Sequence, residues 1–187
     1  MVFSVIREKF GECYPWRILP VHILSSPVVP QRDPDISDED RQAFQDRLVA
    51  SAKGQACSLV FGGPENARID QDKASLLAHA CVKLKRSLCL LDCPLLVGKY
   101  IGETERNLNR LLAEAESQDW ILFFDEADAL FGKHSEPGVY PSKDANFSAS
   151  HLLDIVMKHQ GLLILSNKQK ETLEALKVRV TALIHFR

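Results

Sequence analysis

An apolar stretch near the middle of the chain ends abruptly in two acidic residues. Trp120 to Phe124 contains only aromatic and branched aliphatic side chains, and Asp125 and Glu126 follow directly. A short run without a polar face predicts a strand that is buried on both sides. Open α/β sheets bind their ligands beyond the carboxyl ends of the strands, so both carboxylates are expected at such a crevice. The pair suits an aspartate that holds Mg²⁺ through water and a glutamate that polarises an attacking water. The alternative interpretation is a strand end with two solvated acids.

Strand and helix patterns alternate along the chain on both sides of this run. This alternation predicts an α/β fold with three layers, in which a doubly wound parallel five-stranded sheet lies between helices. The strand that ends at Phe124 is expected in an interior position, because it has no polar face. The expected strands are 57–61, 87–91, 120–124, 161–165 and 180–186, and the expected helices are 37–54, 73–85, 103–117, 146–158 and 171–177.

The first part of the chain has a different composition. Residues 1–36 contain five of the nine prolines, which indicates an extended segment lying over the domain after a short helix near residues 3–10. Ser37 and Asp40 resemble a capping box at the start of the first core helix. We therefore divide the chain into a proline-rich segment, 1–36, and a core domain, 37–187.

Composition and charge narrow the classes of function. The chain has 187 residues, 45% of them hydrophobic and 26% charged, which is typical of a globular domain. A net charge of -2 gives no electrostatic reason to expect nucleic acid or an anionic membrane as a partner. No apolar run approaches the length of a membrane span. Four of the five cysteines fall in or beside predicted strands and helices: Cys57, Cys81, Cys89 and Cys93. They read as small buried hydrophobes in a reducing compartment, so a cytoplasmic location is expected.

Four motifs, in order and in spacing, resemble those of AAA-type ATPases. Phe123-Phe124-Asp125-Glu126 is similar to the Walker B strand, and residues 99–105 are similar to the first pore loop. Residues 163–167 resemble the sensor 1 strand, and 174–186 resemble the segment that carries paired arginines. The resemblance covers residues 56–186 and implies a P-loop NTPase-like fold.

The resemblance also implies cofactors, site residues and partners. The cofactors would be ATP and Mg²⁺, and the partner would be a protein: an active AAA ATPase or another copy of this chain. The implied catalytic residues are Glu126, Asn167 and Arg179, and Asp125 is the implied metal ligand. The implied phosphate-loop residues are Gly62, Gly63, Lys73 and Ser75, and the implied pore-loop residues are Tyr100 and Ile101. A packed or surface tyrosine is an equally good interpretation of Tyr100.

The phosphate loop departs from the family pattern. A working loop reads G-x-x-x-x-G-K-[ST], where glycines let backbone N–H groups converge on the phosphates and the hydroxyl binds Mg²⁺. Counted from the first strand, the lysine and hydroxyl positions hold Arg68 and Ile69; counted back from Asp92, they hold Lys73 and Ala74. The registers differ by five residues, so the loop is expected to be lengthened by five, and neither register has a glycine before the cation. Three acidic residues add negative charge there: Glu65, Asp70 and Asp72.

Two further departures concern the arginine segment and the lid. Val178 occupies the first arginine position, so only Arg179 is left, and the chain stops at Arg187, where the helical lid of the family would begin. The first interpretation is therefore a degenerate AAA core, a pseudo-ATPase that serves as a binding or regulatory module. The second is a weak but genuine ATPase that uses Lys73 and Ser75, and the third is an unrelated α/β binding domain. Asp125 to Asp128 also spell the D-E-A-D of a helicase family, but the chain has no room for a second RecA-like domain.

Overall fold

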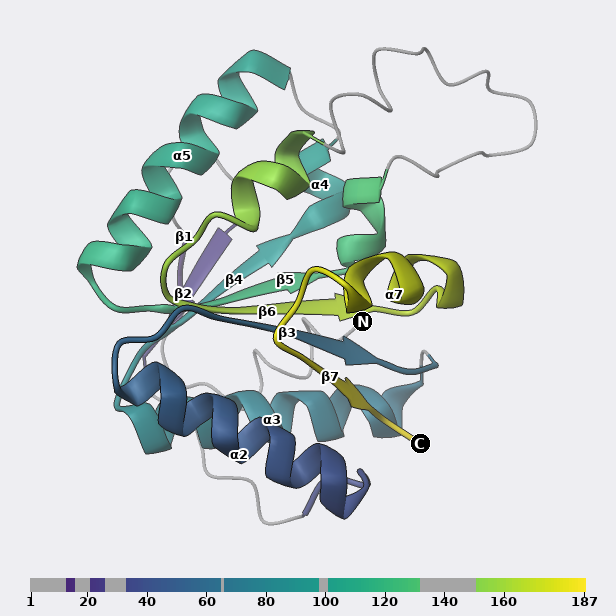
Figure 1. Ribbon diagram of the computed structural model, residues 1–187. Coiled ribbons are helices and arrows are strands. Elements are labelled where there is room, and N and C mark those ends of the chain that lie inside the picture. The colour runs from purple at the N-terminus through teal and green to yellow at the C-terminus, as the bar shows by residue number, and fades with distance from the viewer. Residues whose placement is uncertain (1–12, 16–20, 26–32, 65, 98–100, 132–150) are drawn as a thin grey trace.

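A seven-stranded sheet forms the centre of the computed structural model, which describes residues 13–15, 21–25, 33–64, 66–97, 101–131 and 151–187. Its five core strands run parallel, as the sequence predicts, and β5 lies in the interior between β4 and β6 (Figure 1). The interior position of β5 confirms the prediction from its lack of a polar face. The parallel strands, in spatial order, are β4 (Leu88–Asp92), β5 (Ile121–Asp125), β6 (Leu162–Asn167), β3 (Cys57–Gly62) and β7 (Ala182–His185).

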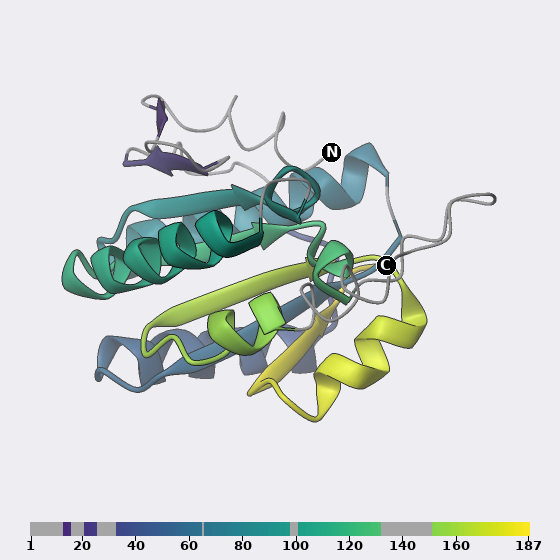
Figure 2. The same cartoon turned by 90° about the horizontal axis from the view of Figure 1, so that it is seen from above.

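Two antiparallel strands extend the sheet beyond β4. The strands β1 (Cys13–Pro15) and β2 (Val21–Leu24) come from the proline-rich segment, and β2 pairs with β4 (Figure 2). The sequence did not predict them, because the prolines favoured an irregular extended segment. Proline is tolerated at the end of an edge strand, where its missing N–H costs no ladder hydrogen bond, so Pro15 can close β1. The expected helix at 3–10 lies outside the described residues.

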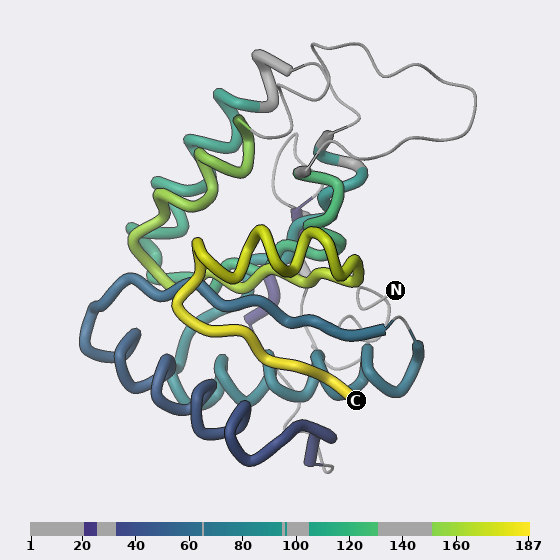
Figure 3. The backbone as a smooth tube through the Cα atoms, turned by 45° about the vertical axis from the view of Figure 1, so that its right-hand side comes forward, coloured from purple at the N-terminus to yellow at the C-terminus, as the bar shows by residue number. Residues whose placement is uncertain are grey.

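Helices cover both faces of the sheet and enclose two hydrophobic clusters (Figures 1 and 3). On one face, α2 (Asp38–Ala52) and α3 (Ala67–Leu84) bury Phe44, Leu48 and Leu77 against the strands. On the other, α5 (Ile101–Ser117), helical residues 151–156 and α7 (Lys170–Lys177) pack over β5 and β6. Two short helices follow β4 and β5: α4 (Cys93–Val97) begins directly after β4, and η1 (Ala127–Phe131) begins after Glu126. These layers confirm the three-layer arrangement.

The start of α3 differs from the expectation. The helix begins at Ala67, six residues before the expected start at Lys73, and Asn66 caps it by accepting a hydrogen bond from the Ile69 N–H at 2.9 Å. An asparagine with an extended backbone is a strong helix N-cap, and this local signal was missed because Asp70 and Asp72 were read as loop residues. The connection from β3 to α3 is therefore short, and the expected five-residue lengthening of the loop is wrong.

Candidate active site

Most of the candidate residues lie at the carboxyl ends of the parallel strands. This end of the sheet is here called the Asp125 edge. Gly62 at the end of β3 is in register with Asn167 at the end of β6, and Asp92 at the end of β4 is in register with Asp125. Glu126 follows Asp125 at the same edge. The order of the strands therefore assembles residues that lie up to 105 positions apart along the chain.

Asp125 is a buried carboxyl, with 5% of the residue exposed. Burial and the nearby charge of Glu126 raise its pKa to about 6, although attraction to Lys73 works in the opposite direction. Its Oδ1 accepts a hydrogen bond from the Glu126 N–H at 3.1 Å. Ionising this carboxyl is thus costly, and a nearby cation makes it less so.

Glu126 has a backbone φ of 51°, an unusual value for a residue other than glycine. Its side chain is half-buried, and Oε1 lies 3.7 Å from Lys168 Nζ. Lys168 follows Asn167 directly, so this ion pair joins the end of β5 to the end of β6. The glutamate is therefore directed along the candidate edge and toward β6.

Asn167 belongs to a buried network that sequence reasoning missed. Its amide Nδ2 lies 2.9 Å from Thr172 Oγ1, and its Oδ1 accepts the Gln169 N–H at 2.8 Å. Asp128, only 4% exposed, accepts hydrogen bonds from the Thr172 hydroxyl at 3.1 Å and the Lys168 N–H at 3.3 Å. The signal in the sequence was the last letter of D-E-A-D, which we interpreted only as a helicase motif. Asp128 joins η1 to the start of α7 and so holds Asn167 in place.

Lys73 lies inside α3 with its side chain directed at the sheet. Its residue is 3% exposed, and Nζ donates to Ser166 Oγ at 3.1 Å, next to Asn167. The same ammonium lies 5.9 Å from the centre of the Phe186 ring. Ser75 is also buried, but its hydroxyl donates to the Gln71 carbonyl at 2.7 Å, within the helix. Of these two sequence candidates, Lys73 is the one that the structure places near β6.

The loop after β3 is crowded by the end of the chain. The Phe186 N–H donates to the Gly62 carbonyl at 2.8 Å. A Cβ at Gly63 would lie 3.0 Å from the Phe186 carbonyl oxygen, and one at Gly62 would lie 2.9 Å from a terminal methyl of Leu173. The two glycines therefore allow β7 and α7 to pack closely on this loop. Because α3 begins at Ala67, the register counted from β3 puts Arg68 in its first turn.

Arg179 lies near the amino ends of the parallel strands, at the end of the sheet opposite the Asp125 edge. It follows α7, which runs away from Asn167. The chain then enters β7, and the Thr181 N–H donates to the carbonyl of Ser58, near the start of β3, at 2.8 Å. Its guanidinium pairs with Asp154 at 2.5 Å. The structure does not bring Arg179 to the other candidate residues. Tyr100 lies outside the described residues, and Ile101 is the first residue of α5.

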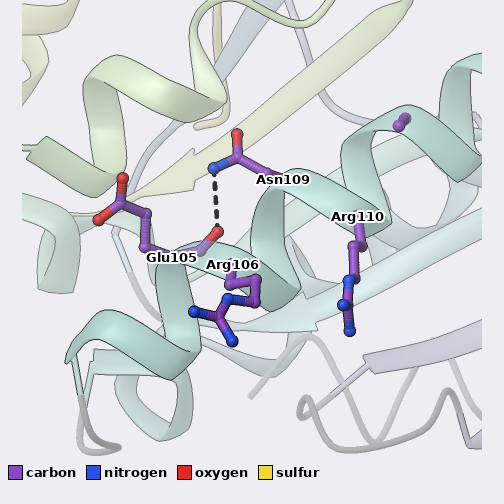
Figure 4. A pocket seen from close by; sticks show the side chains of 5 residues that line it. Glu105, Arg106, Asn109 and Arg110 are labelled. Carbon is purple, nitrogen blue, oxygen red and sulfur yellow. Dashed lines mark hydrogen bonds between the residues drawn. The ribbon is translucent and has the colours of Figure 1, made fainter.

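One surface cavity lies on the side of α5. This shallow cavity of about 570 Å³ has described lining residues from α5 alone: Glu105, Arg106, Asn109, Arg110 and Ala113 (Figure 4). Within the described part of the chain, no three acidic, histidine or cysteine side chains are grouped to hold a metal ion. None of the described helices is both long and apolar enough to span a bilayer.

Comparison with known proteins establishes the family. The model of the ATPase family associated with various cellular activities (AAA) matches residues 72–187, more than half of the chain. The chain belongs to the AAA family. The match of this AAA chain begins one residue before Lys73, so Gly62 and Gly63 lie outside it.

Curated relatives agree with the family assignment, and a solved structure agrees with the fold. The AAA chain is 33% identical over 79 residues to the ATPase family gene 2 protein of Schizosaccharomyces pombe, across 42% of its own length and 9% of the relative's. It is 32% identical over 103 residues to an AAA ATPase forming ring-shaped complexes from Kocuria rhizophila, across 48% of its length and 18% of the relative's. The crystal structure of the FIGL-1 AAA domain matches its fold with a TM-score of 0.64 at 13% identity, over 99% of this chain and 60% of that one. The AAA chain thus spans a small part of the curated relatives that it matches.

Proposed function

We propose that this AAA chain is a pseudo-ATPase, which keeps the family fold without binding Mg-ATP tightly and acts as a binding or regulatory module. The family in general binds nucleotide and Mg²⁺, so the proposal concerns what this chain has lost. The observation that carries it is the structure at the start of α3. A phosphate would bind there, but side chains of this chain already contact the groups that would bind it. Its partner would be a protein, either an active AAA ATPase or another copy of this chain.

Local hydrogen bonds support the loss of a phosphate cradle. In a phosphate loop, glycine N–H groups and the free N-terminus of the following helix face the anion. Here Asn66 Oδ1 already accepts from the Ile69 N–H at 2.9 Å, and Arg68 is paired with Asp35. Phe186 packs on Gly63 from the other side. A phosphate would have to displace all three groups.

Charge supports the same proposal. Asp70 and Asp72 lie in the first two turns of α3 and are 3% and 1% exposed. Carboxylates near a helix N-terminus use the favourable helix dipole that a phosphate would otherwise use. Two unit charges of the same sign ~4 Å apart repel by about 4 kcal/mol at an effective dielectric of ~20, so acidic side chains close to a triphosphate would weaken its binding strongly.

Calorimetry with Mg-ATP tests the proposal. We expect no measurable heat of binding up to about 1 mM Mg-ATP. The midpoint of thermal unfolding should also stay unchanged, because a ligand stabilises a protein only slightly when its concentration is far below its Kd. A dissociation constant in the micromolar range, with a matching rise in the unfolding temperature, would overturn the pseudo-ATPase proposal.

The position of Lys73 favours a second candidate function, a weak Mg-ATP-dependent AAA ATPase that remodels a protein partner. Lys73 Nζ bonds Ser166 beside Asn167, and its charge attracts Asp125. This arrangement gives a cation, a carboxylate and an amide at one strand edge. If the chain is such an ATPase, Lys73→Ala abolishes Mg-ATP binding. Glu126→Gln then retains binding and loses hydrolysis, since glutamine keeps the shape of the side chain and removes the base. Arg68→Ala is the matched control: if it abolishes binding and Lys73→Ala does not, the register counted from β3 is the working one.

The assembly proposed for this chain follows from the position of Arg179. An arginine at the far edge of the sheet cannot reach the Asp125 edge of its own chain, so any nucleotide role requires a neighbour. Such a head-to-tail contact closes into a ring when the rotation between copies allows it. The name of the Kocuria rhizophila relative describes ring-shaped complexes, which supports a protein partner of the same family for this chain.

A further inference from the structure

Residues 33–36, here called the strap, cross from the start of α2 to the start of α3 and the end of β7. They precede the capping residue Ser37, and the Arg41 guanidinium donates to the Pro34 carbonyl at 3.1 Å. Pro34 and Ile36 are buried, whereas Asp33 is exposed. The strap is therefore anchored by two apolar residues and lies beside the loop that follows β3.

On one side the strap binds the first two turns of α3. The Asp35 carboxylate pairs with the Arg68 guanidinium, and the Asp35 N–H donates to Asp72 Oδ2 at 3.3 Å. Asp72 is almost completely buried, so this backbone N–H helps to satisfy a carboxylate that has lost water. One strap residue thus contacts α3 through both its side chain and its backbone.

On the other side the strap holds the segment that crowds the loop. Ile36 forms an antiparallel bridge with Phe186 and shares its hydrophobic cluster. Phe186 in turn bonds Gly62 and packs on Gly63. The strap therefore reaches both ends of the connection from β3 to α3: the glycines through Phe186 and the helix start through Arg68.

We propose that the strap is an autoinhibitory contact, in which Asp35 acts as an internal anion that occupies Arg68 and keeps phosphate-bearing ligands from the start of α3. This inference rests on the proposed function, because it explains how the site is closed. It adds that the closure is reversible: movement of the strap frees Arg68 and loosens the hold of Phe186 on the glycines. The Arg68–Asp35 pair is half exposed and therefore weak by itself, which suits a contact that has to open.

Binding of inorganic tripolyphosphate, measured by calorimetry, tests the strap. Asp35→Ala removes the internal anion and keeps the backbone N–H to Asp72. Asp33→Ala is the matched control, because it removes a carboxylate two residues away that is 95% exposed. We expect Asp35→Ala to bind tripolyphosphate up to about fivefold more tightly than Asp33→Ala, the largest factor that corresponds to the strength of an exposed ion pair. The additional variant Asp35→Ala/Arg68→Ala should lose this gain. Equal affinities of Asp35→Ala and Asp33→Ala would overturn the inference.

Hydrogen exchange provides a second readout on the same variants. Amides of residues 67–72 should exchange faster in Asp35→Ala than in Asp33→Ala, because the strap no longer holds the start of α3. If Asp35→Ala loses the helical circular dichroism of the wild type, Asp35→Asn replaces it and must show the same gain in affinity. The two proposals fail separately. Tight Mg-ATP binding by the wild-type chain that depends on Lys73 would overturn the pseudo-ATPase, whereas unchanged affinity and exchange in Asp35→Ala, with no Mg-ATP binding, would overturn the strap alone.

Discussion

At the scale of single residues, the polar groups at the Asp125 edge are partnered within the chain. Asp128 accepts from two backbone N–H groups and a hydroxyl, and Lys73 donates to Ser166. Buried polar groups with partners hold a site in one arrangement, whereas the same groups without partners are costly. These contacts within the chain therefore hold the polar groups of this edge in one arrangement.

Asp128→Ala should destabilise the fold. It leaves the Lys168 and Gln169 N–H groups and the Thr172 hydroxyl without their acceptor in a buried place. The expected loss is about 2 kcal/mol or more in the free energy of unfolding, since each unsatisfied buried group costs about 1–3 kcal/mol. Urea denaturation measures it, with Glu174→Ala on the exposed side of α7 as the control. Equal midpoints for the two variants would show that Asp128 does not hold this edge.

His159 predicts how stability depends on pH. Its side chain is fully buried, and burial lowers its pKa below the ordinary 6.5 even though Glu116 Oε1 lies 3.3 Å from Nδ1. Below about pH 6.5 the unfolded chain therefore binds a proton that the folded chain does not, so stability falls as pH falls. The slope for one proton is at most about 1.4 kcal/mol per pH unit.

Two histidine variants check this prediction. His159→Gln removes the buried imidazole, so its free energy of unfolding should fall less between pH 7 and 5.5 than that of the wild type. His151→Gln, on the exposed side of helical residues 151–156, should follow the wild-type curve. Urea denaturation at several pH values gives the curves, and parallel curves for all three proteins would contradict the assignment to His159.

At the scale of elements, the start of α3 decides how the phosphate loop is interpreted. The helix has two extra turns before Lys73, which place Lys73 within the helix and against β6. The α7 helix has the complementary role. It starts beside Asn167 and ends before Arg179, so a single element connects the two edges of the sheet.

Asn66→Ala should cost about 1 kcal/mol of stability, because it removes the side-chain acceptor of the Ile69 N–H at the helix start. Asn109→Ala is the control, since Asn109 lies on the exposed side of α5 and bonds only the Glu105 carbonyl among the described contacts. Thermal or urea unfolding gives the difference. If α3 began near Lys73 instead, Asn66→Ala would cost no more than the control.

At the scale of the whole molecule, the two ends of the parallel strands carry different residues of the proposed site. Asp125, Glu126 and Asn167 lie at one edge, and Arg179 lies at the other, paired with Asp154. An assembly that uses all of these residues must bring the Arg179 end of one copy to the Asp125 edge of the next copy. Assembly in that way must also break the Arg179–Asp154 pair, which opposes it slightly.

We therefore predict that this chain alone is a monomer or a weak oligomer. No tightly held nucleotide is expected to strengthen the contact between copies. Light scattering coupled to gel filtration measures the mass at micromolar concentrations. A stable hexamer under these conditions would contradict the prediction. Asp154→Ala, which frees Arg179, tests whether the internal pair restrains assembly.

The sequence by itself determined the order of the parallel strands and the long helices along the chain. It also determined the interior place of β5 and the carboxylates at its end, because a strand without a polar face has one stable environment. It also identified the family, because the motifs that resemble this family are local in the chain. Only the tertiary structure decided which cations and carboxylates meet. Lys73 reaches Ser166, Asp35 reaches Arg68, and Asp128 reaches the start of α7 through contacts between residues 33 to 93 positions apart. Such pairings depend on how the helices pack on the sheet, and no local pattern of residues contains that information.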